Sequence, residues 1–277
     1  MPSTAMESAF SDILAWLVAT TMRGLHSCDT GEVVCRETAV IQEGLLPSLQ
    51  GGIPTAMSVI DKYGIGWLLS PKPWALSPEP KPTKLDGSSS SLGYKNVSGL
   101  GTLSTSPIAI INRSVVNRSW GLMPETYGPH FHYQEYLPSR NAFTAMLIHI
   151  ATKIGFLLLG VPLVRWLIRC SVKLLPYILP PENAGHHQKD HFEFRAIGTA
   201  DGTKNKARVG ARFAYDGSGY WLCAFIAVEA AVVLLKEEET QMKKKMGGGL
   251  LTPSTLGMVY VERLRKAGAT IEAEAMV

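Results

Sequence analysis

The stretch between Tyr136 and Pro181 contains no Asp or Glu, and most of its other residues are apolar. Its basic side chains are Arg140, Lys153, Arg165, Arg169 and Lys173. A basic, apolar segment without acidic residues is typical of a chain that meets an anionic lipid surface. The segment therefore predicts a membrane contact, which we expect the following side chains to make: Lys153, Arg165, Trp166, Arg169 and Lys173.

The length of this segment allows more than one arrangement. Residues 143–164 are long enough to cross a bilayer, which takes about 20 apolar residues. However, Lys153 lies near the middle, where a charge costs roughly 3 kcal/mol on insertion scales. Gly160 and Pro162 then interrupt the helix, because proline lacks an amide donor and clashes with the preceding turn. The pattern favours two helical pieces that form a protruding apolar hairpin, interfacial or re-entrant. A single span and a helix pair buried against the protein or a dimer partner are the alternatives.

The rest of the chain mixes strand and helix patterns, which predicts an α+β fold with a mixed or antiparallel sheet packed by helices. We expect strands at 31–43, 130–137, 192–200, 207–215 and 270–273. We expect helices at 11–26, 53–63, 108–120, 220–235 and 252–266, with Ser11 and Asp12 capping the first. Residues 70–101 are rich in Pro, Ser and Gly and predict an irregular loop. Residues 1–142 and 182–277 then form one domain, from which the segment 143–181 projects.

Composition excludes some classes of function. A hydrophobic fraction of 46% supports a sizeable core. The net charge of +4 is modest, and much of the basic excess lies in the acid-free segment described above, so it gives no case for nucleic-acid binding. The four cysteines are scattered without a C-x-x-C pair, which argues for an intracellular, reducing compartment and against a structural zinc site. His187 and His191 lie in a linker bounded by Pro and Gly, so we expect no metal site there.

No catalytic pattern stands out in the chain. The sequence has no G-x-G-x-x-G after a strand, no Walker loop, no H-E-x-x-H and no G-x-S-x-G, so the catalytic residues stay unknown. Polar residues among apolar ones in 112–130 would suit the wall of a cleft. The candidates for that wall are Asn112, Arg113, Tyr127 and His130.

Several stretches together resemble a known family. They are 5–16, 101–107, 115–122, 127–129, 192–202 (FEFRAIGTADG) and 247–256 (GGGLLTPSTL), and Gly51-Gly52 falls where the family has a double glycine. In this order and spacing they resemble the saccharopine dehydrogenase-like oxidoreductases, which include trans-acting enoyl reductases of lipid biosynthesis. The similarity runs from about Ala5 to the C-terminus. The sequence departs from the family at Phe10, where the family has proline, and at Ile53, where it has threonine.

The resemblance implies an NADP(H)-dependent reductase that acts on a lipid-like substrate at a lipid droplet or endomembrane. Family members begin with a dinucleotide-binding Rossmann domain, and Met1 falls just before the junction that follows it. We therefore expect this chain to be the substrate-side and membrane-associating half, to bind no cofactor itself and to be inactive alone. It would work as a homodimer or with a separate Rossmann-bearing chain. The competing hypothesis is a non-catalytic, membrane-associated binding or scaffold protein on the same fold.

Overall fold

The computed structural model describes residues 6–40, 57–66, 72–80, 93–178, 190–202, 207–236 and 249–276. Its strands are β1 (Thr30–Val40), β2 (Tyr94–Val97), β3 (Gly101–Thr105), β4 (His132–Pro138), β5 (His191–Ala200), β6 (Arg208–Asp216) and β7 (Thr270–Met276). Its helices include α1 (Met6–His26), α4 (Ala109–Leu122), α5 (Pro124–Tyr127), α6 (Ala142–Leu158), α7 (Pro162–Ile178), α8 (Gly219–Lys236) and α10 (Gly257–Lys266). The 3₁₀ helix η1 (Pro253–Leu256) precedes α10, and residues 57–63 are also helical.

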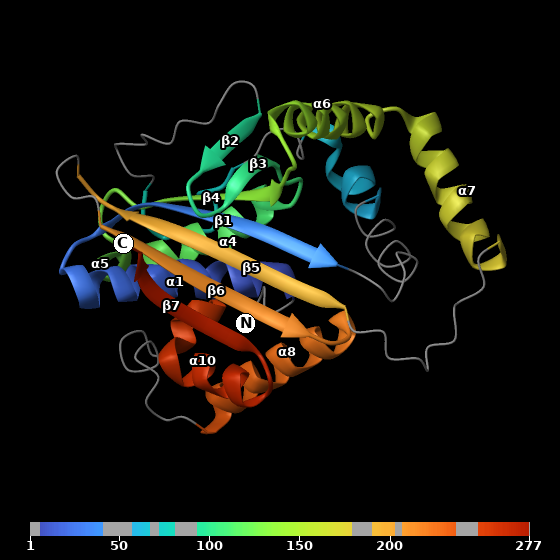
Figure 1. Ribbon diagram of the computed structural model, residues 1–277. Helices are drawn as coiled ribbons and strands as arrows, with labels where there is room; N and C mark the ends of the chain where they lie inside the picture. Colours follow the sequence, from blue (N-terminus) through green and yellow to red (C-terminus); the bar gives the residue numbers. More distant parts are fainter. Residues whose placement is uncertain are drawn as a thin grey trace.

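The described strands form one seven-stranded sheet in the order β2-β3-β4-β1-β5-β6-β7 (Figure 1). β1 and β4 pair in parallel, whereas the other neighbouring strands pair antiparallel. The sheet is therefore mixed, which confirms the predicted α+β class. A strand occupies the described part of every predicted strand range, and β5 and β6 form the predicted antiparallel pair.

The core lies between α1 and the sheet. α1 crosses the face formed by β1, β5, β6 and β7, and Figure 1 shows α4, α8 and α10 on the same side. Phe10 of α1 packs between Phe194 of β5 and Phe213 of β6, with ring centroids 4.9 Å and 4.1 Å apart. Val18, two turns further along α1, lies so close to β5 that a Cβ on Gly198 would come within 2.2 Å of its Cγ1. Gly198 therefore permits the close approach of the helix.

The protruding hairpin that we expected is not formed. α6 begins at the predicted place, because the side chain of Asn141 accepts a hydrogen bond from the Thr144 amide at 2.8 Å. The helix ends at the predicted break around Gly160 and Pro162. There the chain turns by 100°, so α6 and α7 diverge like the arms of an L instead of packing side by side (Figure 1). No single described helix is long and apolar enough to cross a membrane, but this bent pair meets the length and composition together.

Three further expectations need correction. Ser11 and Asp12 do not cap α1, because both lie within the helix Met6–His26, with their side chains buried. The predicted loop 70–101 contains β2 within its described part, since residues 94–97 pair with β3. The predicted helix 252–266 is split at Gly257, whose φ of +69° favours glycine. The glycine pair at 51–52, Ile53 and the linker 181–189 lie outside the described residues.

Candidate functional site

A buried polar cluster forms around Asp12 of α1. Its carboxylate accepts hydrogen bonds from Ser119 Oγ of α4 at 2.5 Å and from the backbone amide of Ser254 in η1 at 2.8 Å. Ser119 Oγ also lies 2.6 Å from Thr252 Oγ1. We call these four residues the Asp12 cluster. Because the partners come from α4 and from the start of η1, the cluster joins three elements that are far apart in the sequence.

The Asp12 carboxyl is wholly buried, which changes its acidity. Burial raises the pKa of Asp12 to about 6, although the hydrogen bonds from Ser119 and Ser254 favour the ionised form and oppose this shift. Tyr127 lies nearby and is also wholly buried; burial, and then the charge of Asp12, raise the pKa of its phenol well above the usual value. Asp12 can therefore exchange a proton near neutral pH. Because the cluster is buried, it holds α1, α4 and η1 together and is closed to a substrate in this structure.

A second buried carboxylate, Glu135 of β4, lies beside the first turns of α1. It accepts hydrogen bonds from Ser11 Oγ at 2.5 Å, from Tyr133 Oη at 2.7 Å and from Asn112 Nδ2 at 2.8 Å. Ser8 Oγ donates in turn to Asn112 Oδ1 at 2.7 Å. Burial raises the pKa of Glu135, and the three hydrogen bonds oppose that shift. The Asn112 side chain therefore joins α4 to both α1 and β4.

The four residues predicted to line a cleft do not meet in one open space. Asn112 and Tyr127 are buried, at 1% and 0% exposure. Arg113 is half-buried, and burial lowers the pKa of its guanidinium. His130 lies near the surface, where its Nδ1 is 2.6 Å from Asp201 Oδ2. Of the four, Asn112 and Tyr127 touch the buried polar groups, whereas His130 pairs with the turn that follows β5.

The second candidate site is the exposed side of α6 and α7. Large apolar side chains recur along both helices at spacings of three and four residues, which places them on one face of each helix. We call this set the α6–α7 apolar surface: Phe143, Leu147, Ile150, Ile154 and Leu157 on α6, and Leu163, Trp166, Leu167 and Leu174 on α7. Each of these side chains is exposed, and Phe143, Leu157 and Leu163 exceed 60% exposure. So many exposed large apolar side chains on two neighbouring helices are unusual on a protein that works alone in water.

The opposite side of α6 holds it to the body of the protein. Ala145 is fully buried, and its carbonyl accepts a hydrogen bond from Ser104 Oγ of β3 at 2.7 Å. His149 Nδ1 lies 2.6 Å from Thr105 Oγ1, also on β3. Burial, and then the charge of Lys153, lower the pKa of His149. These contacts fix which face of α6 points outward, so the exposure of the apolar side chains follows from how α6 is anchored.

The cations predicted to contact a membrane divide into two groups. Lys153 and Lys173 are exposed on their helices, as is Trp166. Arg165 and Arg169 instead turn toward Asp61 on the helix at 57–63. Sequence patterns gave no sign of Asp61, because it lies about a hundred residues earlier in the chain and belongs to no motif. The partners of Asp12 were also missed, since isolated serines and threonines carry no spacing signal.

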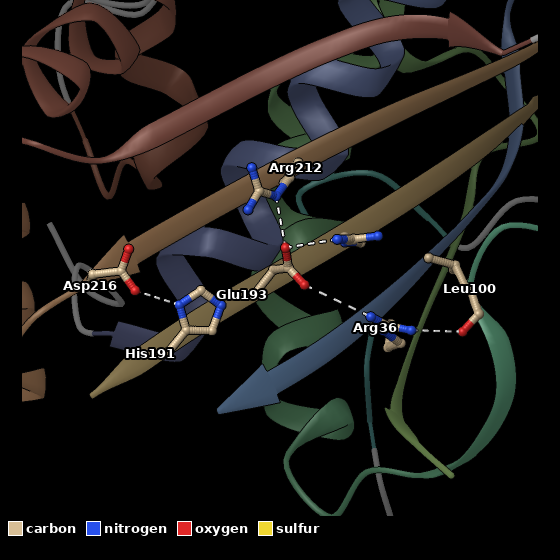
Figure 2. A network of polar contacts seen from close by, with 7 residues as sticks. Arg36, Leu100, His191, Glu193, Arg212 and Asp216 are labelled. Carbon is tan, nitrogen blue, oxygen red and sulfur yellow. Dashed lines mark hydrogen bonds and ion pairs between the residues drawn. The ribbon is translucent and has the colours of Figure 1, made fainter. Parts of the chain in front are cut away.

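A third polar group lies on the face of the sheet away from α1. Arg36, Arg195 and Arg212 occupy adjacent positions in one row across β1, β5 and β6. Figure 2 shows Arg36 and Arg212 on either side of Glu193. Glu193 accepts hydrogen bonds from Arg195 at 3.0 Å and from Arg212 at 2.7 Å. Burial opposes ionisation, but these arginines hold the pKa of Glu193 below its usual value. The row thus places like charges side by side, an arrangement that Glu193 relieves.

A groove of about 310 Å³ runs beside this row. Arg195 and Arg212 line it together with Glu272 and Glu274 of β7, over an apolar floor that includes Ile197. Because both signs of charge line the groove, its chemistry selects no one class of ligand. Of the two histidines His187 and His191, only His191 lies among the described residues. Its Nδ1 is 2.6 Å from Asp216 Oδ1, so it already contacts a carboxylate (Figure 2). Among the described residues no group of three His, Cys, Asp or Glu could hold a metal ion.

Comparisons of the chain with protein-family models, with curated proteins and with solved structures find no match.

Proposed function

We propose that this protein docks on anionic lipid surfaces through the α6–α7 apolar surface. The observation that carries the proposal is the exposure of that surface on two helices whose sequence contains no acidic residue. Burying a large apolar side chain contributes roughly 1.5 to 3 kcal/mol, so several of them together outweigh the loss of freedom on docking. Lys153 and Lys173 would then add attraction to acidic headgroups.

The bend between the helices favours an interfacial contact over a span. Lys153 would lie at the centre of a spanning helix, whereas on a helix lying in the interface its side chain reaches the headgroups. The amphipathic pattern of α7, with apolar residues on one side and basic residues beside and opposite them, is that of a helix lying in the plane of the interface. An intracellular lipid droplet or endomembrane is the surface that this proposal assigns.

Vesicle sedimentation tests the docking proposal. We expect the purified chain to sediment with phosphatidylcholine vesicles that contain phosphatidylserine, and to do so less as salt is added. Replacing Leu157 and Leu163 together by serine should weaken binding by roughly ten-fold or more, since each loses a buried apolar side chain. The matched control is Leu235→Ser on α8, which removes an exposed leucine outside the surface. Failure of the unmodified chain to sediment at low salt would reject the proposal.

A second candidate function is the substrate-side half of an NADP(H)-dependent reductase for a lipid-like substrate. This candidate is favoured because several of the stretches that resemble the reductase family come together in the fold. Asp12, Ser119, Tyr127 and Ser254 come from four such stretches and gather in or beside the Asp12 cluster. In this candidate function, a dinucleotide-binding domain in another chain or in preceding sequence would complete the catalytic cleft.

Oxidation of NADPH in the presence of a Rossmann-bearing partner separates this candidate from a non-catalytic docking protein. We expect the isolated chain to leave NADPH fluorescence unchanged, and to acquire NADPH oxidation only when a Rossmann-bearing partner is supplied. The genomic sequence upstream of Met1 is the direct place to look for that partner, as a strand followed by G-x-G-x-x-G. Oxidation of NADPH by the chain alone would contradict the proposal that the nucleotide binds to another domain. If the upstream genomic sequence encodes something unrelated, that domain cannot come from the same gene.

A further inference from the structure

Two arginines of α7 converge on a single carboxylate. Arg165 Nε lies 3.5 Å from Asp61 Oδ1, and Arg169 donates a hydrogen bond from its guanidinium to Asp61 Oδ2. The two arginines are one helical turn apart, so their guanidinium groups reach the same side of α7. Together they form a cationic pair that holds an anion, and in this structure the anion is supplied by the protein itself.

The pair differs in how firmly each member is fixed. Arg165 donates to the carbonyls of Leu159 at 2.7 Å and Gly160 at 3.0 Å, so it also closes the end of α6 at the bend. Its side chain is mostly buried, whereas those of Arg169 and Asp61 are 41% and 45% exposed. Exposed ion pairs between side chains add little to stability. Another anion can therefore replace the Asp61 carboxylate without dismantling the fold around Arg165.

The position of the pair suits the phosphate of a lipid. Trp166 and Leu167 lie between Arg165 and Arg169 in the sequence and belong to the α6–α7 apolar surface. When those side chains enter the interface, long arginine side chains on the other side of α7 can reach the headgroups, as basic residues do on interfacial helices. A phosphate group offers more acceptor oxygens and more negative charge than a carboxylate, and guanidinium groups bind it in the same forked geometry.

We propose that Arg165 and Arg169 form a binding site for the phosphate of an anionic lipid headgroup, and that Asp61 occupies this site until lipid displaces it. The inference rests on the proposed docking function and adds a regulation to it. Away from lipid, Asp61 neutralises part of the cationic charge of α7. On an anionic surface the two arginines exchange Asp61 for headgroup phosphate, so docking becomes selective for acidic, phosphate-rich membranes.

The substitution Asp61→Asn tests the exchange, because asparagine keeps the size of the side chain and loses its charge. We expect Asp61→Asn to raise affinity for phosphatidylcholine vesicles containing phosphatidic acid by about five-fold, the gain that one freed basic residue brings near an anionic surface. Affinity for pure phosphatidylcholine should not change. Glu262→Gln on α10 is the matched control, since it removes one exposed negative charge far from α7 and should leave vesicle binding unchanged.

Repeating the Asp61→Asn substitution in a second variant shows whether the gain in affinity comes from the freed arginines or only from the change in net charge. In a chain carrying Arg169→Gln, the gain from Asp61→Asn should shrink, because one freed cation is missing. A gain that persists in full would overturn the proposal, as would equal binding by Asp61→Asn and the unmodified chain. Without vesicles, inorganic phosphate should stabilise the unmodified chain against heat no more than chloride does at equal ionic strength. A phosphate-specific stabilisation that Arg169→Gln abolishes would assign the pair to free phosphate instead. If no variant binds vesicles, the docking function itself fails, which is a distinguishable result.

Discussion

Phe10 and Asp12 show how differently two nearby positions of one buried helix are used. Phe10 fills the space between two aromatic rings of the sheet. Asp12 lies two residues later, and its carboxyl is wholly buried among donors from α4 and η1. Such a group is tolerated because its hydrogen bonds replace the water it has lost. The sequence predicted a helix from residue 11 with Asp12 as its cap, so it left Phe10 outside the helix. It gave no information about the partners of Asp12, which come from distant parts of the chain.

The raised pKa of Asp12 gives stability a pH dependence with a definite sign. The folded protein holds the proton more tightly than the unfolded chain, because burial raises the pKa from 3.8 to about 6. The stability contributed by the neutral acid is therefore complete below about pH 4 and is lost as the pH rises through about 6. The shift corresponds to roughly 3 kcal/mol. In the unmodified protein, the free energy of unfolding should fall by about that amount between about pH 4 and pH 7. Asp12→Asn should abolish this fall, and urea denaturation at each pH measures it.

Asparagine suits this test because it can keep both contacts. Its carbonyl can accept from the Ser254 amide, while its amide can donate to Ser119 Oγ, which has the Val115 carbonyl at 3.2 Å as an alternative acceptor. The control Glu262→Gln, an exposed carboxylate on α10, should follow the unmodified protein at every pH. A profile of Asp12→Asn that also matches the unmodified protein would show that Asp12 does not titrate in this range.

At the scale of elements, the approach of α1 to β5 depends on the absence of one side chain. A Cβ at Gly198 would lie 2.2 Å from Val18 Cγ1, a distance that real contacts do not reach. We expect Gly198→Ala to lower the free energy of unfolding by about 1 to 3 kcal/mol, because overpacking forces helix and strand apart. Thermal or urea unfolding measures the change.

A second glycine provides the comparison for that experiment. Gly24 lies in α1 with open space around its Cα, so Gly24→Ala should leave stability unchanged or raise it by up to about 1 kcal/mol through helix propensity. If both substitutions proved equally harmless, the close packing of α1 on β5 would be refuted.

The break between α6 and α7 shows what local patterns can and cannot predict. Gly160 and Pro162 signalled an interruption, and the structure has it there. The angle was not predictable, because it depends on Arg165 reaching back to the carbonyls of α6 and, with Arg169, across to Asp61. Without those long-range contacts the simplest expectation was two helices side by side. The face that each helix exposes was predictable in outline from its apolar spacing.

At the scale of the whole molecule, the strand ranges and the α+β class could be predicted because alternation of apolar residues is a local property. The strand order could not, since the parallel pairing of β1 with β4 joins residues about a hundred positions apart. β2 escaped prediction because a four-residue edge strand in a Gly- and Ser-rich region carries little alternation. The candidate sites followed the same rule: the lipid-contact segment was visible as a continuous run, whereas the Asp12 cluster is assembled from scattered residues.

The central place of α1 has a consequence for how the chain acquires its structure. Asp12 takes a hydrogen bond from Ser254, 242 residues further on, and α1 also packs against β7. During synthesis from the N-terminus, the apolar side of α1 therefore emerges long before the segments that cover it. The nascent polypeptide must keep that helix shielded, by transient collapse or by a chaperone, until Ser254 and β7 have been synthesised.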